Sequence, residues 1–233
     1  MTQIKNLTII ALLATGTLGS CKKSDRYETN PGNIVSTEVV QDAGQKIAPA
    51  NAAQSPSSAV NWKGGNISIL SMHFEGNILG PVDDTRPVYA EYGQPVLADL
   101  FSPSLAGTLK VPYGPYTITT LRMRIGPFAG SAYALQFQGS FVDQNELVPV
   151  QVFVDNTTEL RGQNKSRIIV SQSSEYMSKV SLNVNTLTKG LDQSMLQNME
   201  RTNGTVVISN KSNLEDYRLV LANMQNMLTV AYP

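Results

Sequence analysis

The chain has 233 residues, and its 18 basic and 18 acidic residues give a formal net charge of +0. That length suits one domain of ordinary size, with or without a tail. Because no long block of positive charge offers an electrostatic footprint for nucleic acid, we exclude a polynucleotide partner. Charged residues make up only 15% of the chain, and this composition, rich in Ser, Thr, Asn and Gln, is typical of exported β proteins.

The first twenty residues have the features of an export signal. Lys5 supplies a positive charge, and the apolar run Leu7–Ala14 is too short to span roughly 30 Å of hydrocarbon as a stable helix. The sequence Leu18-Gly19-Ser20-Cys21 resembles the bacterial lipobox, in which the cysteine is acylated before cleavage. We predict a signal peptide over residues 1–20 and attachment of acyl chains such as palmitate at Cys21. The alternative is an ordinary signal peptide followed by a free cysteine; as the only cysteine, Cys21 cannot form a disulfide within the chain.

The predicted lipid would anchor the protein without any membrane-spanning segment. Each buried methylene contributes about 0.8 kcal/mol, so two or three acyl chains hold a protein on a bilayer. Lys22 follows the cysteine, at the position where an aspartate would resemble an inner-membrane retention signal of some Gram-negative bacteria. We therefore expect residence in the outer membrane, with the leaflet left open.

The next segment has the composition of a tether. Residues 21–61 are rich in small and polar residues, and Pro31, Pro49 and Pro56 interrupt any helical pattern. A coil of that length would hold the folded part on the order of 35 Å from the bilayer. Ile34–Val40 has strand composition and could instead dock on the domain. We expect residues 62–233 to form that domain, and a chain beginning at Asn61 to fold alone.

The pattern beyond Trp62 indicates short strands separated by Gly, Pro and Asn. The clearest alternation runs over Tyr116–Ile125, where Leu121, Met123 and Ile125 alternate with polar residues. Asp143–Glu146 is predicted to be a hairpin loop. The expected strands are Asn66–Glu75, Pro87–Leu97 with an interruption at Gly93, Ala106–Val111, Tyr116–Ile125, Tyr133–Val142, Leu147–Val154, Arg167–Gln172, Met177–Asn185 and Thr205–Ser209. Many short strands with few helical spacers predict a mainly β, two-layer antiparallel sandwich.

Two helices are expected near the end of the chain. Asp192–Met199 would form a short one, stopped by the turn Thr202-Asn203-Gly204. Ser212 and Glu215 have the spacing of a capping box at the start of an amphipathic helix over Asn213–Leu228. Its predicted buried stripe consists of Leu214, Tyr217, Leu221, Met224 and Leu228. We expect this stripe to pack on the domain.

Several of these segments resemble one family. Leu97–Phe101, the turn Val111–Tyr116 and the alternating strand Ile118–Ile125 look like the strand-turn-strand core of a widespread family of uncharacterised bacterial lipoproteins. Arg201–Ser209 and the final helix look like its C-terminal end. The resemblance implies a transthyretin- or immunoglobulin-like sandwich, and it implies no activity.

Candidate reactive residues are few. His73 is the only histidine, which excludes multi-histidine metal sites and leaves one base for a Ser-His-Asp triad. Asp83 with Asp84, or Asp143 with Glu146, could ligate a hard cation, but no calcium-loop spacing is present. Carboxylates for glycoside hydrolysis would have to come from a sparse, locally unpaired set: Glu75, Glu91, Asp99, Glu146, Asp155 and Glu159. We therefore predict no catalytic, metal or cofactor site.

A group of tyrosines offers a different kind of site. Tyr89, Tyr92, Tyr113, Tyr116 and Tyr133 could build an aromatic platform for a sugar, or could pack in the core. The leading hypothesis is a non-enzymatic envelope lipoprotein that binds a glycan or a protein partner. The alternatives are a structural or pilus-type assembly subunit and a hydrolase that depends on His73.

Overall fold

The computed structural model describes residues 33–41, 59–80, 84–102, 104–170 and 176–231. The leader, Cys21, the segments 22–32 and 42–58, and Asp83 lie outside the described residues. All described residues belong to one compact unit, Pro31–Pro233. Strands dominate this part of the chain, so the predicted mainly β fold is confirmed.

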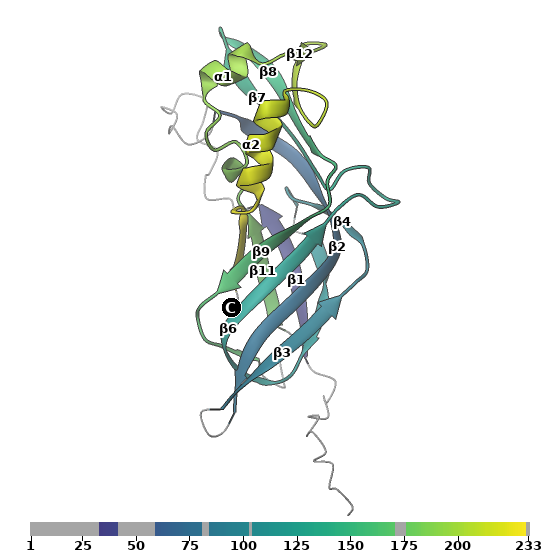
Figure 1. The fold of residues 1–233 in the computed structure, drawn as a ribbon, viewed down its shortest axis with the longest axis vertical. Coiled ribbons are helices and arrows are strands. Elements are labelled where there is room, and N and C mark those ends of the chain that lie inside the picture. Colours follow the sequence, from purple (N-terminus) through teal and green to yellow (C-terminus); the bar gives the residue numbers. More distant parts are fainter. Residues whose placement is uncertain (1–32, 42–58, 81–83, 103, 171–175, 232–233) are drawn as a thin grey trace, which may run out of the picture. The chain divides into compact units, whose positions relative to one another are not determined.

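The strands form two sheets (Figure 1). The smaller sheet has the order β14-β11-β1-β5 and contains β1 Asn33–Gln41, β5 Ser104–Val111, β11 Tyr176–Leu182 and β14 Leu228–Ala231. The larger sheet has the order β10-β6-β2-β7-β8-β13-β12, with β3 and β4 also paired to β2, and β9 to β6. Its strands are β2 Asn61–Leu79, β3 Thr85–Tyr92, β4 Val96–Asp99, β6 Gly114–Ile125, β7 Leu135–Asp143, β8 Glu146–Val154, β9 Thr158–Asn164, β10 Ile168–Val170, β12 Arg201–Thr202 and β13 Thr205–Ile208.

The two sheets share one core. Buried side chains from both sheets belong to a single apolar cluster. Strands of the smaller sheet also lie against strands of the larger one, β5 beside β3 and β4, and β14 beside β9. Most pairings are antiparallel, as predicted, but β1 pairs in parallel with β11, and β13 with β8. A parallel pair needs a long crossover connection, so local sequence patterns do not reveal it.

The long strand β2 organises the larger sheet. Its first half pairs with β7 and β4, and its second half with β6 and β3. The register of β2 against β6 shifts between Ile69 and Ser71, where the strand passes from one set of partners to the other. Ile67, Ile69, Met72 and Phe74 are buried on either side of this shift, so β2 contributes to the core along much of its length.

Strand β1 lies in the middle of the smaller sheet, with β11 on one side and β5 on the other. The predicted tether over residues 21–61 therefore does not hold for Asn33–Gln41, and the alternative of a docked strand does. The folded unit also begins well before residue 62. Ile34–Val40 has the composition of a strand, but nothing local shows which strands would flank it.

The hairpin predicted at Asp143–Glu146 is present, with a two-residue turn in place of the four-residue loop. Asp143 pairs with Glu146, and Gln144 and Asn145 between them both have positive φ, as a tight two-residue turn between twisted strands requires. Asn203 and Gly204 form a similar turn between β12 and β13, and Gly204 at φ +80° supplies a conformation that most side chains disfavour. The interruption predicted at Gly93 separates β3 from β4.

Helix α1, Gln193–Asn198, begins after Asp192, whose carboxylate accepts a hydrogen bond from the backbone N–H of Met195 at 2.8 Å. Hydrogen bonds from the Ser194 hydroxyl and from this N–H lower the pKa of Asp192. The helix anchors one hairpin, because Gln193 donates to the carbonyl of Val142 and Gln197 donates to Asp143.

Helix α2 is shorter than predicted, and its buried stripe includes Tyr217 and Met224 as predicted but omits Leu214. It spans Leu214–Met224, and its buried residues are Tyr217, Val220 and Met224. Leu214 is 44% exposed, and Leu228 lies in strand β14. The capping box is wrong, because Asn213 occupies the N-cap in a left-handed conformation without a side-chain cap bond.

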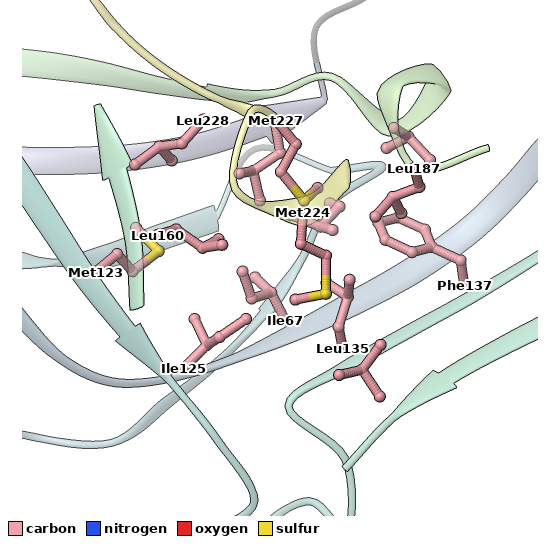
Figure 2. Packing of buried hydrophobic residues seen from close by; sticks show 14 of the residues in the cluster. Ile67, Met123, Ile125, Leu135, Phe137, Leu160, Leu187, Met224, Met227 and Leu228 are labelled. Carbon is pink, nitrogen blue, oxygen red and sulfur yellow. The ribbon is translucent and has the colours of Figure 1, made fainter. Parts of the chain in front are cut away.

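The end of α2 packs into the shared core. Figure 2 shows Met224 near Ile67 and Leu135 of the larger sheet, and Met227, which follows the helix, in the same buried cluster. All four side chains are 0% exposed. The prediction that the helix packs on the domain is therefore confirmed, although the stripe that does so is shifted.

Candidate binding face

One outward face of the larger sheet brings together several candidates from the sequence analysis, among them His73 and Tyr89, with other polar side chains. It is built by β3, β2, β6 and β9, which lie side by side in that order (Figure 1). Side chains two residues apart along a strand share a face, and the strand register aligns them in rows. We call this set the polar face; it consists of Ser71, His73, Glu75 and Asn77 on β2, Pro87, Tyr89 and Glu91 on β3, Ile118, Thr120, Arg122 and Arg124 on β6, and Glu159, Arg161 and Gln163 on β9.

Charges on the polar face are balanced and interleaved. Three glutamates, Glu75, Glu91 and Glu159, lie among three arginines, Arg122, Arg124 and Arg161. Figure 1 places the strands that carry them next to each other. Such a face has no net charge while His73 is neutral, so it does not attract polyanions or polycations by its field alone.

Arg122 connects the two ends of this charge network. Its Nη2 lies 3.0 Å from Glu75 Oε1 and 3.1 Å from Glu75 Oε2, and its Nη1 lies 3.9 Å from Glu159 Oε1. The side chains of Arg122 and Glu75 are 36% and 32% exposed. A pair this exposed contributes about 0–1 kcal/mol to stability, so its main effect is to fix the orientation of the Glu75 carboxylate.

A hollow of about 150 Å³ lies at one end of the polar face. Its lining follows from the register: Glu75 lies opposite Tyr89 on β3 and opposite Thr120 on β6, and Asn77 lies opposite Pro87. Ile118 and the backbone of Gly76 complete the lining. The phenol ring of Tyr89 is unusually open, with 73% of the residue exposed, and Ile118 is 45% exposed. The hollow thus combines two accessible apolar groups with a carboxylate and an amide.

His73 lies on the polar face next to two groups that a catalytic triad would use. Ser71 Oγ lies 3.1 Å from His73 Nε2, and Glu91 Oε1 lies 3.5 Å from the same nitrogen. A triad requires the nucleophile on one ring nitrogen and the carboxylate on the other. Because both groups meet Nε2, this arrangement does not make a proton relay from Ser71 through His73 to Glu91.

Two of the carboxylates considered as cation ligands, Asp143 and Asp84, are engaged in other contacts. Asp143 forms an ion pair with Arg201 and accepts a hydrogen bond from Gln197, so it ties the β7–β8 hairpin to β12 and α1. Asp84 pairs with Arg86 at 3.1 Å. Among the described residues, no group of three or more His, Cys, Asp or Glu side chains could hold a metal ion.

Of the six carboxylates considered for glycoside hydrolysis, the structure brings three onto the polar face: Glu75, Glu91 and Glu159. Asp155 instead accepts hydrogen bonds from Asn210 and Tyr217, which holds α2 on the domain. Burial and the nearby Asp155 charge raise the pKa of Tyr217. Asp99 accepts a hydrogen bond from the backbone N–H of Phe101 in the turn after β4.

The five tyrosines do not form one platform. Tyr116 is fully buried, where its hydroxyl donates to the carbonyl of Pro112 at 2.7 Å and burial raises its pKa. The ring of Tyr133 packs on that of Phe153, with centroids 4.7 Å apart. Tyr92 is partly buried against the core, and Tyr113 is half-buried. Tyr89 alone of the five is exposed and lies on the polar face.

No helix in the described ranges is long and apolar enough to cross a membrane. No protein-family model matches this chain, and neither a curated protein nor a solved structure matches it.

Proposed function

We propose that this protein is an outer-membrane-anchored lipoprotein whose folded domain is a non-enzymatic binding module for a glycan or protein partner at the cell envelope. The observation that carries the proposal is the polar face, where the exposed ring of Tyr89 borders a hollow among paired charges. Exposed aromatic groups flanked by polar side chains are common anchors of binding surfaces. The ion pairs of this face suit recognition, because they hold polar groups in fixed positions.

The geometry favours binding over catalysis. The one histidine has both of its candidate partners on the same ring nitrogen, and Glu75 is paired with Arg122 through both of its oxygens. Neither group is arranged to pass a proton along a relay. Hydrolysis, the third hypothesis from the sequence, therefore draws no support from these residues.

The position of β1 shortens the proposed link to the membrane. Only residues 22–32 separate Cys21 from the first residue of β1, so the link reaches about 40 Å when fully extended and averages roughly 20 Å as a coil. Asn33 pairs with Val111, immediately before the turn into β6. That end of the domain, which also carries Asn77 and Ile118 of the hollow, is the end to which the lipid-bearing link would attach.

The proposal predicts that the polar face is covered by a partner in the native envelope. Cys21 is the only cysteine and would be blocked by lipid, so a cysteine introduced elsewhere is the only free thiol of the mature chain. We expect Asn77→Cys and Glu91→Cys, both exposed on the polar face, to react with a maleimide more slowly in intact envelopes than in the purified protein. Leu147→Cys, 67% exposed on β8, is the matched control and should react equally fast in both.

The proposal would be contradicted if all three variants reacted as fast in intact envelopes as in the purified protein. The polar face would then be uncovered in the native envelope. Protection of Leu147→Cys alone would favour the assembly-subunit alternative instead. Leu147 lies opposite Val142 on β7, and both are exposed apolar residues that a second copy could cover.

A further inference from the structure

We propose that the hollow beside Tyr89 is a subsite for one ring of a neutral saccharide. This inference rests on the proposed binding function and names the class of ligand. A pyranose ring has an apolar C–H face and a rim of hydroxyl groups, so it needs an aromatic or aliphatic surface next to fixed hydrogen-bonding groups.

The strand register supplies both kinds of surface at the correct spacing. Neighbouring strands lie about 4.8 Å apart, so Tyr89 on β3 and Ile118 on β6 flank β2 from opposite sides, roughly 10 Å across. Glu75 and Asn77 lie between them on β2. A single sugar ring fits this width, with its apolar face on Tyr89 and its hydroxyl groups over β2.

The polar groups are suited to hydroxyl donors. Arg122 Nη2 engages both oxygens of Glu75 from one side, which holds the carboxylate in one orientation. Each carboxylate oxygen has two lone-pair sites, so Glu75 can accept further hydrogen bonds from a pair of adjacent sugar hydroxyls. The Asn77 side chain is exposed and offers one acceptor and two donors beside it.

The charge of the lining selects for a neutral ring. Glu75 is the only carboxylate that lines the hollow, no Lys, Arg or His lines it, and Arg122 pairs with Glu75 from outside the lining. A sugar carboxylate or phosphate would lie against the Glu75 carboxylate without a free cation to receive it. With a volume of about 150 Å³, the hollow is also smaller than a typical pocket for a drug-sized ligand, as expected for a single ring.

The test is saturation-transfer NMR on the detergent-solubilised mature protein with maltohexaose, cellohexaose, laminarihexaose and mannohexaose, and with oligogalacturonate as the anionic comparison. We expect at least one neutral hexasaccharide to bind and oligogalacturonate not to bind. Tyr89→Ala should weaken that binding by at least about tenfold, because it removes the stacking surface. Tyr89→Phe keeps the ring and should weaken binding much less than Tyr89→Ala does. Glu75→Gln should weaken binding while shifting the melting temperature by no more than a few degrees.

Tyr133→Ala removes a tyrosine outside the hollow and serves as the matched control, with its melting temperature recorded alongside. Binding that survives Tyr89→Ala, or tighter binding of oligogalacturonate, would overturn the subsite. If no neutral hexasaccharide binds but Asn77→Cys and Glu91→Cys are protected in envelopes, the saccharide inference fails and the binding proposal stands with a protein partner. If those thiols are also unprotected, both fail.

Discussion

A chain that begins at Asp42 is expected to lose cooperative folding, whereas a chain that begins at Pro31 is expected to fold. The difference is β1, which pairs with β11 along seven residues and with β5 on its other side. Without β1, β5 is separated from β11 and β14, and the smaller sheet loses its central strand. A domain has a net free energy of unfolding of only about 5–15 kcal/mol. We expect the loss of both strand pairings of β1 to remove most of it.

Circular dichroism during a urea titration measures this directly. We expect a single cooperative transition for the chain from Pro31, and for the chain from Asp42 either no transition or one at much lower urea. A chain from Asn61 should behave like the chain from Asp42. Identical urea midpoints for the chains from Pro31 and Asp42 would show that β1 contributes nothing to stability. They would support the tether that the sequence predicts over residues 21–61.

Met224→Ala is expected to destabilise the domain by about 2–5 kcal/mol, the range for truncating a large buried side chain. Met224 is 0% exposed and lies beside Ile67 and Leu135 (Figure 2). Leu214→Ala on the same helix is the control, because Leu214 is 44% exposed and its truncation should change stability by no more than about 0.5 kcal/mol.

The measurement is the urea midpoint of each variant, compared at equal slopes of the unfolding transition. We expect a lower midpoint for Met224→Ala, on the core-facing side of α2, and an unchanged midpoint for Leu214→Ala, on its outward side. If Leu214→Ala proves as destabilising as Met224→Ala, the buried stripe extends to Leu214 as the sequence predicted, which contradicts the exposure of Leu214 in the structure. If neither variant changes the midpoint but both change the oligomeric state, the helix is an interface between copies.

Strands with regular alternation were predictable from the sequence. The β6 pattern of Leu121, Met123 and Ile125 alternating with polar residues matches its burial. Strand β9 was missed because its sequence is polar apart from Leu160, and the Gly162 that also faces inward has no side chain. Strand β14 was missed because Leu228 continues the spacing of the preceding helix, although the helix ends at Met224.

The candidate site was less predictable than the fold. Single residues such as His73 and Tyr89 could be identified, but their neighbours depend on which strands flank β2. Arg122 is 47 residues from Glu75 in sequence, and it meets Glu75 only because β6 pairs with β2. The hollow likewise needs side chains from three strands, so no local motif could indicate it.

Lipid on Cys21 would hold the folded domain at a membrane surface. The mass of the N-terminal peptide of the mature protein, purified from membranes, tests this proposal directly. We predict that this peptide begins with an acylated Cys21, and that Cys21→Ala leaves the chain unacylated with its leader uncleaved. A mature N-terminus at any other residue, or an unmodified Cys21, would contradict the proposed anchoring.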